Sequence, residues 1–148
     1  MILHRTSGLA SACLALASVA QAADDPAQCL ALATYWESKG CSREDMTAVG
    51  SVVLNRLADK AFPDAVCAVV KEGGETPPCQ FSWWCDGKSD QPEESEDWRQ
   101  AREVANQLLS DPPPDPSNGA LYFHSNDIEP PWADLRQTAA IDCHKFYK

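Results

Sequence analysis

The fold is decided by residues 26–59, which read PAQCLALATYWESKGCSREDMTAVGSVVLNRLAD. Asp25 is a typical N-cap residue, and Pro26 suits the first position of a helix. Apolar and small side chains then recur at helical spacing until Gly40, a residue type that commonly ends helices. We therefore predict a helix over residues 26–39.

A second helix is expected directly after the first. Ser42 and Asp45 have the spacing of a capping box, and apolar pairs then repeat every four residues up to about Asp59. The apolar face of this helix is the best candidate for the core of the protein.

The remainder of the chain predicts shorter elements. A brief helix ends near Val70, and helical spacing returns over residues 97–109. Four prolines within residues 111–116 exclude a helix there. A short strand is expected over residues 120–123, and residues 138–147 are strand-like. We therefore expect one α+β domain, mainly helical, with a small β-sheet.

Composition limits the kind of protein and its partners. The chain has 148 residues, with 12 basic and 22 acidic side chains, a net charge of −10 and 44% hydrophobic residues. This length suits one ordinary domain with a real core. The negative charge argues against nucleic acid and anionic membrane surfaces as partners.

Residues 1–22 have the features of a secretory signal peptide. Arg5 precedes an apolar run over residues 9–20, and small residues end at Ala22, where a signal peptidase would cut. Cleavage would leave residues 23–148 as one domain, and we expect it to be exported to the periplasm or secreted. No later segment is long and apolar enough for a membrane anchor. The alternative is a buried N-terminal helix.

The cysteine count changes when the leader is removed. Cys13 leaves with it, and an even number of cysteines remains in an oxidising compartment, which predicts three disulfide bonds. Six cysteines allow fifteen pairings, and the sequence does not choose among them. Zinc is the competing explanation, but no C-x-x-C or H-E-x-x-H spacing occurs, so we expect no metal. The six are Cys29, Cys41, Cys67, Cys79, Cys85 and Cys143.

Glu37 is the carboxylate best suited to chemistry. It extends the apolar stripe of the first predicted helix, follows Trp36, and lies where the helix dipole disfavours an ionised acid. Each effect raises the pKa of a carboxyl group, as a general acid at neutral pH requires. The alternative is an ordinary solvated glutamate at a helix end.

Two aromatic segments are candidates for a binding groove. Residues 80–86 combine aromatic faces with polar edges, a combination that suits sugar rings. Alternation along the predicted strand places Tyr122 and His124 on one face. The alternatives are that Phe81 and one tryptophan belong to the core, and that the histidine is structural. The expected groove residues are Ser82, Trp83, Asp86, Tyr122 and His124.

Other chemistries have less support. Ser82 lacks a G-x-S-x-G setting, and an even cysteine count leaves no thiol nucleophile. The pair Gly73 and Gly74 is isolated, so no phosphate-binding loop is indicated. We expect no cofactor.

The ordered motifs of this chain resemble the SleB-type cell wall hydrolase family, which cleaves bacterial peptidoglycan and includes spore-cortex-lytic enzymes. The resemblance covers roughly residues 30–148. Its carriers, read in order, are LATYWE (32–37) with Gly40, VVLNR (52–56), FPDAVC (62–67), QFSW (80–83), DGKSD (86–90), GALYFH (119–124) and HKFY (144–147).

The resemblance implies a fold of the lysozyme and lytic transglycosylase type, with Glu37 as the catalytic acid. The implied reaction breaks the β-1,4 bond between N-acetylmuramic acid and N-acetylglucosamine in peptidoglycan glycan strands, with one glutamate as acid and then base. Internal attack by the muramoyl C6 hydroxyl would make the chain a lytic transglycosylase, and attack by water a muramidase. We expect a monomer.

This chain departs from the family pattern at Cys41, where the family commonly has a second acidic residue. Glu44 is the candidate to compensate for it. The resemblance also suggests Cys67–Cys85 as one disulfide. The departure leaves one alternative open, a catalytically inactive, disulfide-stapled module that binds or inhibits at the wall. A second alternative, to which only genomic neighbours such as an immunity gene could point, is a toxin-like hydrolase delivered to competitors.

Overall fold

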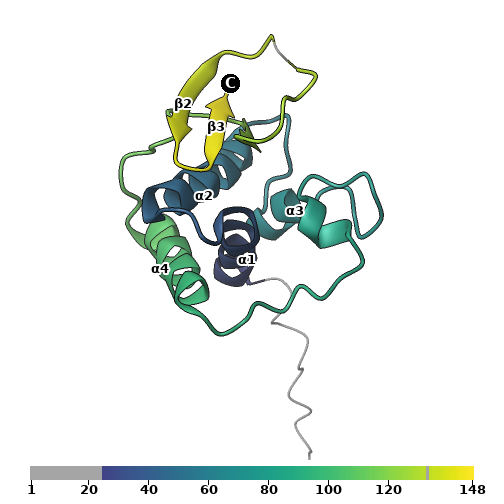
Figure 1. Cartoon of the computed structure of the whole chain (residues 1–148), viewed down its shortest axis with the longest axis vertical. Helices are drawn as coiled ribbons and strands as arrows, with labels where there is room; N and C mark the ends of the chain where they lie inside the picture. The colour runs from purple at the N-terminus through teal and green to yellow at the C-terminus, as the bar shows by residue number, and fades with distance from the viewer. Residues whose placement is uncertain (1–24, 133) are drawn as a thin grey trace, which may run out of the picture.

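The computed structural model describes residues 25–132 and 134–148. The predicted signal peptide, with its Cys13, lies outside the described residues. Four α-helices and a small sheet form one body, with the sheet over α2 and the C-terminus at the sheet end (Figure 1). The elements are α1 (Pro26–Ser38), α2 (Arg43–Ala58), α3 (Val66–Val70), the 3-10 helix η2 (Ser82–Cys85), α4 (Glu96–Ser110), β1 (Tyr122–Ser125), β2 (Gln137–Ile141) and β3 (His144–Tyr147).

The first two helices begin at the caps that the sequence predicts. The Asp25 side chain accepts from the N–H of Ala27 at 3.0 Å, and the Ser42 hydroxyl accepts from the N–H of Asp45 at 3.2 Å. The Asp45 side chain does not return to Ser42 as in a full capping box, because it bonds to the sheet instead. Asp45 therefore links the start of α2 to β3.

Helix α2 contributes to two cores. One side packs with α1, α3 and α4, where Val53 is fully buried, and the other packs under the sheet, where Val49 and Val52 meet Phe146. At Gly50 the helices are so close that a Cβ atom would lie 2.5 Å from Leu108 Cδ1. The expectation that α2 supplies the core is confirmed.

The sheet has the order β1-β3-β2 and is antiparallel throughout. The prediction of one strand-like stretch over residues 138–147 was wrong in one respect, because this stretch forms two strands with a turn between them. Asp142 adopts a left-handed backbone with φ 42°, which reverses the chain between β2 and β3. The predicted strand over residues 120–123 is found two residues later, as β1. The predicted class, mainly helical α+β with a small sheet, is confirmed.

The six cysteines form three disulfides, as predicted, but not with the suggested Cys67–Cys85 pair. The pairs are Cys29–Cys67, Cys41–Cys143 and Cys79–Cys85. Cys67 lies in α3 against the start of α1, where its Cα is 5.3 Å from that of Cys29, a normal disulfide spacing. Cys85 instead closes the short loop that begins at Cys79.

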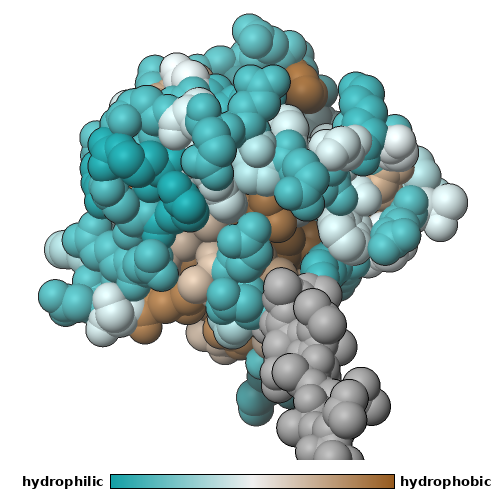
Figure 2. All heavy atoms as spheres, turned by 90° about the horizontal axis from the view of Figure 1, so that it is seen from below, coloured by the Kyte–Doolittle hydropathy of each residue, from teal (hydrophilic) through white to brown (hydrophobic). Residues whose placement is uncertain are grey.

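The surface seen from below is largely hydrophilic, with hydrophobic residues gathered near its centre (Figure 2). Among the described residues, Leu109 and Ile128 are the exposed large hydrophobic side chains. None of the described helices has the length and apolar character needed to cross a bilayer.

The disulfides should differ in their contribution to stability. Cys41–Cys143 spans 102 residues and Cys79–Cys85 spans 6, and a longer closed loop restricts the unfolded chain more. Replacing both cysteines of the long pair by serine should lower the free energy of unfolding by about 4.7 kcal/mol, against about 2 kcal/mol for the short pair. Urea unfolding measures both losses, and equal losses would contradict the expectation.

Candidate active site

Glu37 lies in the last turn of α1, immediately before the chain leaves the helix. The N–H of Lys39 donates to the Tyr35 carbonyl at 2.8 Å and closes the turn. Gly40 then takes a left-handed backbone with φ 82°, which L side chains rarely adopt. The helix therefore ends one residue after Glu37.

The Glu37 carboxyl group opens on a pocket of about 390 Å³, which we call the Glu37 pocket. Helices α1 and α2, the segment before η2, and strands β1 and β3 all contribute to it. Glu37 is its only carboxylate among the described residues. The lining residues are Glu37, Arg56, Cys79, Gln80, Phe81, Ser82, Phe123, His124, Ser125, Ile128 and His144.

Burial dominates the electrostatics of Glu37. It raises the pKa of this carboxyl group from 4.5 to about 7, while the charges of His144 and Arg56 act in the opposite direction. No described residue donates a hydrogen bond to the carboxylate, so the charges of His144 and Arg56 are what offsets the loss of water. Glu37 can therefore hold a proton, and release it, near neutral pH.

Arg56 is the cation of the pocket. It is 2% exposed, and its Nε donates to the Leu121 carbonyl at 2.7 Å. Both terminal nitrogens donate to the side-chain oxygen of Gln80 at 3.1 Å. Burial lowers the pKa of Arg56 to about 10, with Glu72 as the largest opposing charge, so it remains positive at neutral pH. Arg56 thus anchors β1 and Gln80 around the pocket.

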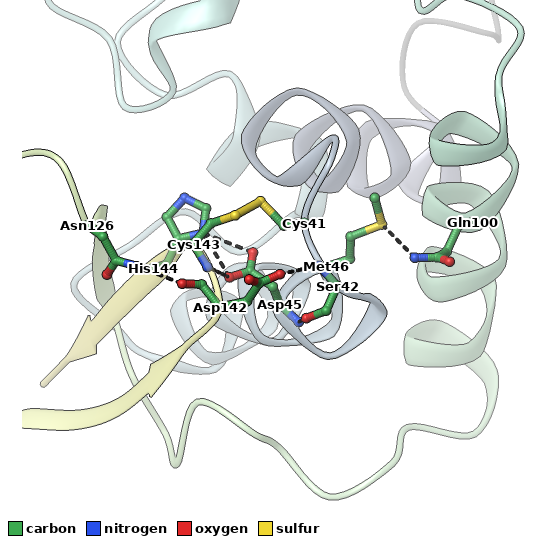
Figure 3. The surroundings of a disulfide bond; sticks show 9 residues. All are labelled: Cys41, Ser42, Asp45, Met46, Gln100, Asn126, Asp142, Cys143 and His144. Carbon is green, nitrogen blue, oxygen red and sulfur yellow. Dashed lines mark hydrogen bonds and ion pairs between the residues drawn. A yellow bond between two sulfur atoms is a disulfide. The ribbon is translucent and has the colours of Figure 1, made fainter.

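His144 reaches the Glu37 pocket from β3. Its Nδ1 donates to the Asp45 carboxylate, 2.9 Å from Oδ1 and 3.1 Å from Oδ2. Asp45 is fully buried and also accepts from the N–H of Cys143 at 3.1 Å. Figure 3 shows this carboxylate beside the Cys41–Cys143 disulfide.

Two of the five expected groove residues line the Glu37 pocket, namely Ser82 and His124. Both ring nitrogens of His124 already have partners: Nδ1 lies 2.8 Å from the Ser125 carbonyl and Nε2 lies 3.0 Å from the Tyr147 hydroxyl. This histidine therefore offers the pocket a fixed ring rather than a free nitrogen.

Tyr122 lies beside the pocket rather than in its lining. Tyr122 and His124 do face one side of β1, because both rings pack on Trp132, with centroids 6.0 and 5.6 Å away. Tyr122 also lies 5.7 Å from the Arg56 guanidinium. Tyr122 can therefore influence the charge in the Glu37 pocket through its contact with Arg56.

Trp83 and Asp86 line a second hollow of about 360 Å³, which we call the Trp36 pocket. The last turn of α1 separates the two sites, since it presents Glu37 to one and Trp36 to the other. The ammonium group of Lys39 lies 4.4 Å from the Trp36 ring centroid in this second hollow. Its lining is Trp36, Lys39, Trp83, Asp86, Lys88, Ser89 and Asp90.

Neither Cys41 nor Glu44, the two positions considered for a second acid, places a carboxylate in the Glu37 pocket. Cys41 is bonded to Cys143, and Glu44 lines a different hollow with Arg43 and Gln107. Within the described residues, the cluster with metal-ligand spacing consists of Cys41, Asp142 and Cys143, whose two sulfurs are bonded to each other. That bond leaves the cluster without free thiolate ligands.

The sequence singled out Glu37 as a candidate, but it assigned no roles to Arg56, Gln80 or His144. Arg56 and His144 belong to the motifs VVLNR and HKFY, and a buried arginine within an apolar helix face was a usable signal. The contact between Asp45 and His144 spans 99 residues, and no local pattern predicts it.

The chain matches the model of the Cell Wall Hydrolase family over residues 40–147. It belongs to this family. The match begins three residues after Glu37, so the role of that residue rests on the geometry above and on the resemblance of its own motif. The resemblance to the SleB-type family is thereby confirmed.

Named relatives agree with this assignment. The chain is 33% identical to the spore cortex-lytic enzyme of Oceanobacillus iheyensis over 68% of this chain, and 33% identical to that of Bacillus subtilis over 70%. It spans only about a third of these relatives, 32% and 30% of their lengths.

Solved catalytic domains show the same fold. One is the catalytic domain of the germination-specific lytic transglycosylase SleB from Bacillus anthracis, with a TM-score of 0.68 and 28% identity, over 90% of this chain and 100% of that one. Another is the catalytic domain of the Bacillus cereus SleB protein, with a TM-score of 0.63 and 27% identity. This match covers 83% of this chain and 89% of that one.

The raised pKa of Glu37 should make folding stability depend on pH. The folded chain binds this proton more tightly than the unfolded chain does between pH 4.5 and about 7, so stability is lost as pH rises through that window. Glu37→Gln should therefore be more stable than the wild type at about pH 8, by roughly 1–3 kcal/mol. Urea unfolding at several pH values measures the difference, which should vanish near pH 4. A difference that is independent of pH would contradict the assignment.

Proposed function

We propose that this chain cleaves the β-1,4 bond between N-acetylmuramic acid and N-acetylglucosamine in peptidoglycan, with Glu37 as acid and base. The observation that carries the proposal is one carboxyl group with a pKa of about 7 in a pocket that has no other described carboxylate. Membership of the cell wall hydrolase family and the fold shared with two SleB catalytic domains support it.

The first step uses protonated Glu37. It donates its proton to the glycosidic oxygen, the bond from C1 of N-acetylmuramic acid to that oxygen breaks, and positive charge develops at C1. A pKa near 7 keeps a large share of Glu37 protonated at neutral pH, which this step requires.

The second step uses the carboxylate that the first step leaves behind. Glu37 removes the proton of the muramoyl C6 hydroxyl as this oxygen attacks C1. The product has a 1,6-anhydro end, and Glu37 is protonated again. Most glycosidases that hydrolyse with water use two carboxyl groups. The single carboxylate of the Glu37 pocket therefore favours a lytic transglycosylase over a muramidase.

Binding must come from contacts other than long-range attraction, because the chain is strongly acidic. Ser82 and His124 line the Glu37 pocket, and Trp83 and Asp86 line the Trp36 pocket on the other side of the α1 end. We assign both hollows and Tyr122 to the glycan groove, with aromatic faces for the sugar rings.

Peptidoglycan lies outside the cytoplasmic membrane, so a chain that cleaves it must be exported. We propose that residues 1–22 direct the chain to the periplasm or out of the cell, where residues 23–148 act as a monomer on glycan strands. Three disulfides fit an oxidising compartment.

Glu37→Gln should reduce the release of muropeptides from purified glycan strands by at least about a hundredfold, because an amide can neither donate nor recover the proton. Liquid chromatography of the soluble products measures the release. Glu44→Gln is the matched control, since it removes an acid seven residues away that lies outside the Glu37 pocket, and it should keep wild-type activity.

Equal release by the wild type and Glu37→Gln would contradict the proposal. Binding of the wild type to sacculi without any release would instead favour the inactive wall-binding module.

A further inference from the structure

We infer that His144, held by Asp45, is a positioning residue that stabilises the Glu37 carboxylate between the two proton transfers. This inference rests on the proposed function. It explains how the acid can be buried enough to stay protonated and still lose its proton during the first step.

The placement of His144 supports this role. The residue is 4% exposed, yet it lines the same pocket as Glu37. Asp45 occupies Nδ1, so Nε2, on the opposite edge of the ring, is the polar atom that His144 can offer. No described residue forms a hydrogen bond with Nε2.

The chain fixes this imidazole through the turn between β2 and β3. The Cys41–Cys143 disulfide joins the segment after Glu37 to the residue before His144. The N–H of Ser42 donates to Asp142 Oδ2 at 2.5 Å, and Asn126 Nδ2 donates to the Asp142 carbonyl at 2.6 Å (Figure 3). Cys41 thus ties the segment after Glu37 to the residue before His144.

The charges around Glu37 are few and can be named. His144 approaches from β3 and Arg56 from α2, and both favour the carboxylate. The His124 ring lines the pocket from β1, with both nitrogens engaged in hydrogen bonds. Behind these groups, Asp45 faces His144, while Glu72 and Tyr122 face Arg56. The Leu121 carbonyl and the Gln80 side chain hold Arg56 in place. A substitution of His144 should therefore remove one of the two groups that favour the Glu37 carboxylate and leave the other, Arg56, where it is.

The test is a titration of the Glu37 carboxyl carbon by NMR in the wild type and in His144→Gln. Removing His144 removes a group that lowers the pKa of Glu37, so the titration midpoint should move upward by about half a pH unit or more. The alkaline limb of the activity profile should move in the same direction, and activity at the optimum should fall about tenfold because the carboxylate is less stable.

Thr138→Val is the matched control. It removes a 2.6 Å hydrogen bond that the neighbouring strand β2 donates to the Ser117 carbonyl, but Thr138 lies outside the Glu37 pocket, so its midpoint should equal that of the wild type. An unchanged midpoint in His144→Gln would overturn the inference, and so would an equal shift in Thr138→Val.

A measurement on the wild type alone covers the case in which His144→Gln does not fold. The imidazole ¹⁵N chemical shifts of His144 should show an inflection at the Glu37 midpoint, because ionisation of a facing carboxyl group changes the electric field at the ring. Absence of that inflection would overturn the inference. These readouts need no turnover, so failure of the inference can be distinguished from failure of the proposed function, which the Glu37→Gln assay reports.

Discussion

The burial of α2 on both sides is the constraint on which the rest of the structure depends. One side holds α1, α3 and α4, and the other carries the sheet. Its two buried charged residues, Asp45 and Arg56, each hold a part of the chain that is distant in sequence. Asp45 binds the β2–β3 turn through the N–H of Cys143 and the start of β3 through His144. Arg56 binds the segment before β1 through the Leu121 carbonyl. Buried charges must be paired to be tolerated, and these pairings assemble the wall of the Glu37 pocket.

The position of Glu37 follows from the same packing. Helix α1 is enclosed by its neighbours, and its last turn therefore carries a carboxylate into a place with little water. Burial favours the protonated acid, whereas His144 and Arg56 favour the carboxylate. These opposing effects leave the pKa close to neutral, where one group can serve as acid and then as base. The Cys41–Cys143 disulfide joins the segment after Glu37 to the residue before His144.

Local signals in the sequence predicted the helices, their caps and Glu37. Asp25 and Ser42 cap as expected, because capping depends on neighbours within a few residues. The hairpin at Asp142 was missed, since its turn has no glycine and is held by Ser42 and Asn126 from elsewhere in the chain. The disulfide pairs and the contact of Asp45 with His144 depend on the tertiary fold. Trp83 and Glu37 occupy separate hollows because the end of α1 lies between them, which no spacing in the sequence reveals.

The central claim is that one carboxylate suffices because the substrate supplies its own nucleophile. Mass spectrometry of the products formed in water enriched in heavy oxygen tests this most directly. We expect muropeptides with 1,6-anhydro ends, lighter than the hydrolysed form by one water and free of the label. Reducing ends that carry the heavy oxygen would contradict it, because they would show that water attacks C1 in the Glu37 pocket.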